Sequence, residues 1–120
     1  MRRCLYTGTL LAAGLLAIQD GAACDVSDIS LDQLKARPAA GDYVHIVGRI
    51  KNNCSTATGV QIKIILLDGE GNILKVDDLW PASVSNIPSH TDFPFDLTIE
   101  SDSAFKRFEV RVMEVKTWRH

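Results

Sequence analysis

The sequence predicts an all-β domain, an antiparallel β-sandwich of six to seven strands, from three observations. First, apolar and polar residues alternate with the period of a strand over residues 43–51, 60–67, 93–100 and 107–112. Second, glycine, asparagine, aspartate and proline gather between these runs, where they favour turns. Third, short runs separated by frequent turn signals are typical of sandwiches.

The first segment of the domain, residues 25–40, allows two interpretations. Ser30-Leu31-Asp32-Gln33 resembles a capping box that opens a helical turn, while Ile29, Leu31 and the later Pro38 fit a short strand that ends in a turn. We favour the strand, because an antiparallel sandwich needs a partner for the strand at 43–51.

The second and third strands differ in how far they are covered. Val44, Ile46 and Ile50 alternate with polar residues, so residues 43–51 have one buried and one wet face. In 60–67 Ile65 and Leu67 fall on the side that is otherwise polar. A strand that is apolar on both faces is covered on both, which predicts a central strand. The polar stretch 52–59 between them is a predicted loop.

A hairpin is predicted after the third strand. Gly69 and Gly71 allow positive φ at little cost, and an apolar run resumes at Ile73. This fourth strand, 73–79, should end before Pro81, since proline cannot donate to a ladder. Residues 82–87 then allow a short edge strand.

The last two strands complete the predicted sandwich. Residues 93–100 place Phe93 and Phe95 on one side and Pro94 on the other, which predicts a strand that either lies at an edge or begins with its proline unpaired. The expected core joins the apolar faces of four strands: Val44, Ile46, Ile50, Val60, Ile62, Ile64, Leu66, Phe93, Phe95, Leu97, Ile99, Phe108, Val110 and Val112.

The first 23 residues are predicted to be a signal peptide, which leaves residues 24–120 as a single domain. Arg2 and Arg3 precede an apolar stretch over 5–18, and small residues follow at 21–23, where a signal peptidase cleaves. The apolar stretch is too short to cross a bilayer, where about 20 residues are needed. We therefore expect a periplasmic or secreted protein.

The charge of the chain argues against a nucleic-acid partner. Cleavage after residue 23 would leave 11 basic and 14 acidic residues, a net charge of −3. The basic residues are also scattered singly, without the basic run or aromatic platform that a phosphate backbone needs.

Two cysteines remain after cleavage, and besides staying as two unpaired thiols they allow two outcomes. Cys24 and Cys54 can form a disulfide, the usual fate of a cysteine pair in an exported chain. Alternatively, Cys24 follows Gly21-Ala22-Ala23, where a lipoprotein would carry its acylated cysteine, and the protein would then be anchored to a membrane. We favour the disulfide, because Gln19 and Asp20 make the approach to Cys24 unusually polar for a lipoprotein signal.

No residue pattern points to catalysis or to a cofactor. The histidines His45, His90 and His120 fall on a wet strand face, in a turn and at the chain end, and no Gly-x-Ser-x-Gly, phosphate-binding glycine loop or His-Glu-x-x-His is present. The sequence therefore favours a protein that is not an enzyme.

Two weaker candidate sites remain. Asp77, Asp78, His90 and Asp92 are the only plausible metal ligands, although their spacing matches no known loop and adjacent strand residues point to opposite faces. Trp80, next to Pro81 at a strand end, fits best as a cap on the core; if it is exposed, it is the candidate for partner binding by strand addition beside the predicted edge strand.

Motif residues over about 43–112 resemble the FxLYD domain family. They are Ile46, Gly48, Asn52, the Ile64-Ile65-Leu66-Leu67-Asp68 pentad, Gly71 and Ile87-Pro88-Ser89-His90 before Phe95. The resemblance implies an immunoglobulin-like sandwich of exported prokaryotic proteins and no catalytic residue. We expect a non-enzymatic module that binds another envelope protein; the alternative is a small periplasmic metal- or ligand-binding protein.

Overall fold

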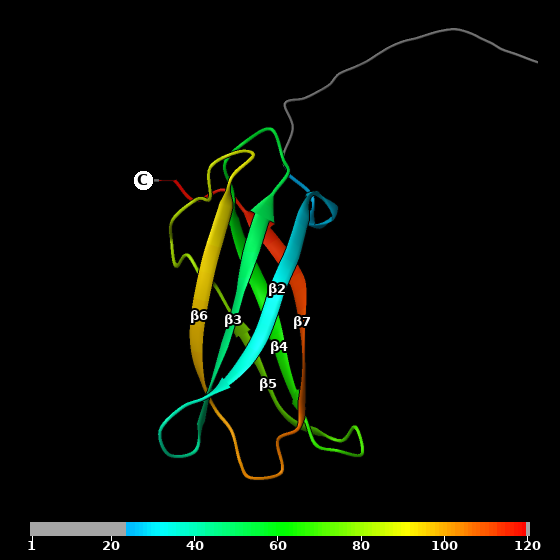
Figure 1. Ribbon diagram of the computed structural model, residues 1–120. Helices are drawn as coiled ribbons and strands as arrows, with labels where there is room; N and C mark the ends of the chain where they lie inside the picture. Colours follow the sequence, from blue (N-terminus) through cyan, green and yellow to red (C-terminus); the bar gives the residue numbers. More distant parts are fainter. Residues whose placement is uncertain (1–23, 120) are drawn as a thin grey trace, which may run out of the picture.

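The computed structural model describes residues 24–119, which form two facing antiparallel sheets (Figure 1). This confirms the predicted all-β sandwich, with six strands. A 3-10 turn, η1 (Val26–Asp28), precedes the strands. They are β2 (Ile29–Pro38), β3 (Tyr43–Asn52), β4 (Gly59–Leu67), β5 (Ile73–Leu79), β6 (Asp92–Glu100) and β7 (Arg107–Lys116). The predicted signal peptide, residues 1–23, lies outside the described residues.

The sheets have the strand orders β2-β3-β6 and β5-β4-β7. The chain changes sheet between β3 and β4, between β5 and β6, and between β6 and β7, as Greek-key sandwiches do. The central position of β4 and the β4–β5 hairpin are confirmed. β6 is an edge strand, where Pro94 lies opposite Arg49. An edge tolerates proline because a missing donor there breaks no inner ladder.

The strand interpretation of the first segment is confirmed. β2 pairs with β3 from Ile29 opposite Asn52 to Pro38 opposite Val44. A capping box does exist, but it lies upstream of the predicted one: the Asp25 side chain accepts from Val26, and the Asp28 side chain accepts from the Asp25 amide. It caps η1, so the segment is a short helical turn followed by a strand.

The predicted edge strand at residues 82–87 is wrong. Consecutive turns occupy this segment, closed by bonds from the Ser83 amide to the Trp80 carbonyl and from the Ser85 amide to the Ala82 carbonyl. Ser83 has a φ of +57°, which is incompatible with a strand. Only Ile87 makes a bridge, with Thr58. Local turns therefore satisfy the backbone groups that an edge strand would have left open.

The core lies between the two sheets and contains every residue predicted for it. Nine of the fourteen are buried, and Phe93, Leu97, Phe108, Val110 and Val112 pack against them half-buried. Ile29 and Ile87 are buried there as well. Phe95 and Leu34 pack over Gly48, where an added Cβ would lie 2.5 Å from Leu34 Cδ2 and 2.9 Å from Phe95 Cζ. Gly48 therefore makes the room that these two side chains fill.

Candidate functional site

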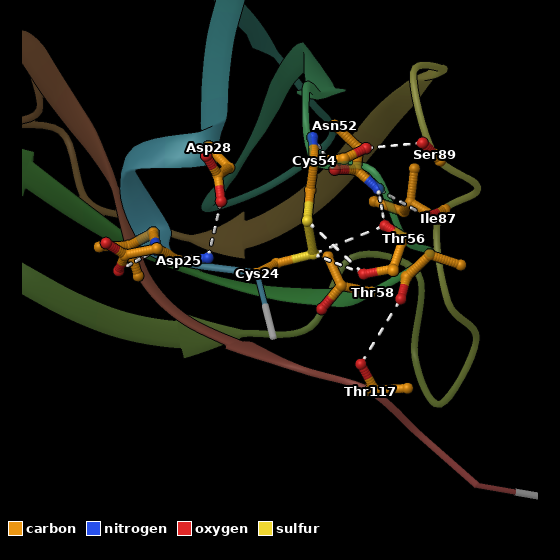
Figure 2. The surroundings of a disulfide bond; sticks show 12 residues. Cys24, Asp25, Asp28, Asn52, Cys54, Thr56, Thr58, Ile87, Ser89 and Thr117 are labelled. Atoms are coloured by element: carbon orange, nitrogen blue, oxygen red, sulfur yellow. Dashed lines mark hydrogen bonds between the residues drawn. A yellow bond between two sulfur atoms is a disulfide. The ribbon is translucent and has the colours of Figure 1, made fainter. Parts of the chain in front are cut away.

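One end of the sandwich is closed by a disulfide between Cys24 and Cys54, both buried (Figure 2). The bond joins the segment before β2 to the loop after β3 and confirms the predicted pairing. The Thr56 hydroxyl lies 3.1 Å from the Cys24 sulfur. A sulfur held in a disulfide cannot also carry a thioether lipid, so this form of the chain is not acylated at Cys24.

Beside the disulfide, the buried side chain of Asn52 joins two loops. Its Nδ2 donates to the carbonyls of Thr56 and Ile87 at 3.1 and 2.9 Å, and its Oδ1 accepts from the Cys54 amide at 2.9 Å (Figure 2). Ser89 Oγ donates to the Cys54 carbonyl at 2.6 Å. These bonds hold the end of β3, the loop after it and the connection before β6 together, so the cluster has a structural role.

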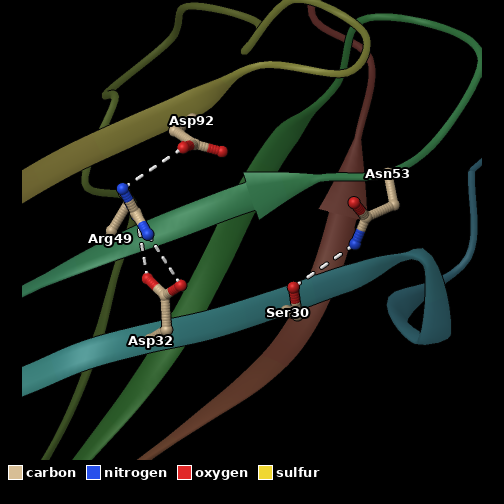
Figure 3. Close-up of polar contacts among 5 residues, drawn as sticks. All are labelled: Ser30, Asp32, Arg49, Asn53 and Asp92. Atoms are coloured by element: carbon tan, nitrogen blue, oxygen red, sulfur yellow. Dashed lines mark hydrogen bonds and ion pairs between the residues drawn. The ribbon is translucent and has the colours of Figure 1, made fainter.

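The wet face of the β2-β3-β6 sheet contains a charged cluster around Arg49 (Figure 3). Its guanidinium donates to both carboxylate oxygens of Asp32 at 2.9 Å and lies 3.5 Å from Asp92 Oδ2. The bond from Arg49 lowers the pKa of Asp32, and the same bond raises the pKa of Arg49. With two carboxylates on one guanidinium, the cluster is an ion-pair network rather than a site for an anionic ligand.

The four candidate metal ligands do not form one site. Asp77 and Asp78 lie on β5, whereas His90 and Asp92 lie before and at the start of β6, in the other sheet. Asp78 pairs with Lys63 at 3.2 Å, and Asp92 is held by Arg49. Among residues 24–119, no group of three or more His, Cys, Asp or Glu side chains is placed to hold a metal ion.

His45 has neighbours that superficially resemble a catalytic relay. Its Nδ1 lies 3.1 Å from Thr98 Oγ1 and 3.1 Å from Asp96 Oδ1. A relay needs the hydroxyl on one ring nitrogen and the carboxylate on the other, and here both meet the same nitrogen. His90 is exposed in a turn, and His120 lies outside the described residues.

Trp80 packs against Trp118 near the end of β7. The two rings meet edge to face, with centroids 5.3 Å apart, and Lys116 Nζ lies 4.3 Å from the Trp118 ring centroid. Asn86 holds Trp118 by exchanging bonds of 2.8 and 2.9 Å with its backbone. Trp80 is half-buried, and the edge strand expected beside it is absent. The Trp80 ring therefore packs on the C-terminal segment that contains Trp118.

The outer face of the β5-β4-β7 sheet has apolar residues that the sequence analysis did not connect. Ile65 lies opposite Val76, and Leu67 lies opposite Ile73. These four residues form what we call the outer apolar stripe. Ile65 and Leu67 are 8% and 7% exposed but lie outside the core cluster, while Ile73 and Val76 are 64% and 44% exposed. The apolar residues on both sides of residues 64–67 were the available signal for it.

Comparisons with known proteins identify no relative of this chain. It matches no protein-family model, and neither the curated proteins nor the solved structures contain a significant match. No helix among residues 24–119 is long and apolar enough to span a membrane. The resemblance to the FxLYD family remains a prediction.

Proposed function

We propose that this chain is an exported, non-enzymatic β-sandwich module that binds another envelope protein. The observation that carries the proposal is the outer apolar stripe. Ile73 and Val76 of β5 expose 64% and 44% of their surface, and they lie opposite Leu67 and Ile65, which are nearly buried. Exposed apolar residues beside a charged rim are typical of protein interaction sites.

The surroundings of the stripe suit a protein partner. Arg107 and Glu109 of β7 lie opposite Leu67 and Ile65, and Lys63 pairs with Asp78 in the next row. This arrangement combines an apolar centre with a charged border. β5 is also an edge strand, so its outer backbone groups are available for strand addition by a partner.

Export is supported by the disulfide, since such bonds persist in oxidising compartments. It agrees with the signal peptide predicted at residues 1–23 and with the resemblance to an exported family. We propose the periplasm or the extracellular space as the location, with the disulfide form free of a lipid anchor.

Site-specific photo-crosslinking in cells of the native source tests the interaction. A photoreactive phenylalanine analogue at Val76 should give a discrete adduct with one other protein, because this side chain is exposed within the stripe. The same analogue at Thr98, exposed on the opposite sheet, is the matched control. Adducts at both positions alike, or none at Val76, would contradict the proposal.

A further inference from the structure

A groove of about 450 Å³ opens at the end of the sandwich away from the disulfide. It lies where β2 ends, β3 begins and the β6–β7 connection passes, among the lower loops of Figure 1. It is lined by Ala36, Arg37, Pro38, Tyr43, Val44, Ser101, Phe105, Lys106 and Phe108. Its volume falls in the range of about 300–1,000 Å³ that is usual for small-molecule sites.

The surface of the groove is largely apolar and aromatic. Val44 is buried, and Phe105 and Phe108 are half-buried where they pack against the core. Tyr43, at the start of β3, is 49% exposed. Three aromatic residues, from β3, the β6–β7 connection and β7, therefore line one concave surface, which suits the flat or branched body of a small organic molecule.

The charged residues of the groove all have one sign. Arg37 and Lys106 are exposed on it, and no aspartate or glutamate lines it. Within residues 24–119, neither cation has a carboxylate at ion-pair distance, whereas Arg49, Lys63, Lys75 and Arg111 each have at least one. The larger groove on the face of the β2-β3-β6 sheet differs, because it contains Asp96 and the already paired Arg49.

The β6–β7 connection that contributes to the groove is anchored at several points. The Ser101 amide donates to the Asp42 carbonyl at 2.6 Å, and the Lys106 amide donates to the Leu67 carbonyl at 2.9 Å. A turn bond from the Phe105 amide to the Asp102 carbonyl, at 3.1 Å, lies between them. A site built from fixed segments needs little ordering when a ligand binds.

We propose that this groove binds a small amphipathic organic anion, with an aromatic or branched apolar body and one carboxylate or sulfonate group. The body packs on Tyr43, Phe105 and Phe108, and the anionic group meets Arg37 and Lys106. This site is separate from the outer apolar stripe, so the two proposals stand or fall independently.

Binding of anilinonaphthalene sulfonate, a fluorescent amphipathic anion, tests the proposal on the protein purified after expression of the full sequence. We expect saturable binding at one site in the groove, with NMR shift changes at Tyr43, Phe105 and Lys106. Phenylnaphthylamine, which has the same rings but no sulfonate, is the uncharged control ligand. The double variant Arg37→Gln/Lys106→Gln should weaken sulfonate binding about tenfold, since each exposed ion pair contributes up to about fivefold.

The matched control variant is Lys35→Gln/Arg119→Gln, which removes two exposed cations that do not line the groove and so changes the net charge as much as Arg37→Gln/Lys106→Gln does. It should leave the dissociation constant within about twofold, and Arg37→Gln/Lys106→Gln should leave phenylnaphthylamine binding unchanged. An equal loss in both protein variants would show attraction to net charge alone and overturn the proposal, as would shift changes confined to other residues. Binding to anionic phospholipid vesicles without binding of the free anion would also overturn it, in favour of a lipid surface.

Discussion

The side-chain amide of Asn52 donates to the carbonyl of Ile87 at 2.9 Å, a contact between residues 35 positions apart. Through this bond the end of β3 holds the connection that leads from β5 to β6. The same side chain accepts a hydrogen bond from the Cys54 amide. One buried residue therefore links the loop that contains Cys54 to the connection between β5 and β6.

Asn52→Ala should lower the free energy of unfolding by about 2–3 kcal/mol, because it leaves the Cys54 amide buried without a partner and leaves the Ile87 carbonyl only its bond from the Thr58 amide. Urea unfolding followed by circular dichroism measures the change. Asn53→Ala is the control: Asn53 is exposed and its side chain makes one bond, of 3.3 Å, to Ser30. A similar loss in both variants would contradict the role assigned to Asn52.

Reduction of the disulfide should also destabilise the domain. Cys24 and Cys54 are 30 residues apart, and closing a loop of that length contributes about 3.6 kcal/mol by the chain-entropy relation. Urea midpoints with and without a reductant measure the effect. The Cys24→Ser/Cys54→Ser variant should match the reduced protein and ignore the reductant. A midpoint that is unchanged on reduction would show that the bond does not stabilise the fold.

Phe95→Ala should cost about 3–5 kcal/mol of stability, because a buried ring would leave a cavity between the sheets above Gly48. Thermal unfolding by circular dichroism provides the measurement. Phe93→Ala, at a half-buried position of the same strand, should cost less. Equal melting of Phe95→Ala and the unaltered protein would refute the assignment of this strand face to the core.

The pKa of Asp32 should rise toward its ordinary value in Arg49→Gln, because Arg49 is the main cause of its lowering. A carboxyl whose pKa is lowered by folding stabilises the fold above its unfolded pKa, and this contribution is lost as the pH falls through the folded pKa. As the pH falls, the free energy of unfolding should therefore decrease less steeply in Arg49→Gln than in the unaltered protein.

NMR titration of the side-chain carboxyls tests this expectation directly. Asp68 serves as an internal control, because its pKa is lowered mainly by hydrogen bonds from the side chain and the backbone of Asn72 and not by Arg49. Its titration should not change in Arg49→Gln. An unchanged pKa of Asp32 in that variant would show that the ion pair does not form in solution.

The strand pattern predicted the core because alternation depends only on neighbouring residues. Every residue expected there lies in or against the core cluster. The burial of Ile87 was not predicted, because Ile87 lies between Asn86 and Pro88 and belongs to no run of alternating apolar and polar residues. Its burial depends on Asn52 and Thr58, which are distant in the sequence. The turns at residues 82–87 were also not predicted. The apolar content of this segment fitted a strand and did not show that its backbone groups bond locally rather than to a neighbouring strand.

The candidate sites show the same limit. The disulfide was predictable because two cysteines in an exported chain have few alternatives. The stripe and the groove depend on which strands become neighbours. Val76 lies opposite Ile65 only through the register of β4 and β5, and Arg37 and Lys106 line the same groove only because the end of β2 lies near the β6–β7 connection. Such pairings arise from topology, which alternation within single strands does not determine.

The position of the disulfide also bears on the order in which the chain can become cross-linked. Cys24 and Cys54 flank a single hairpin, since β2 and β3 are consecutive and Ile29 lies opposite Asn52. Oxidation therefore requires only these two strands to pair, and β4 to β7 need not yet have folded. If the chain is exported as we propose, an oxidant that meets it as it emerges N-terminus first can lock this hairpin early and leave a covalently closed template for the rest of the sandwich.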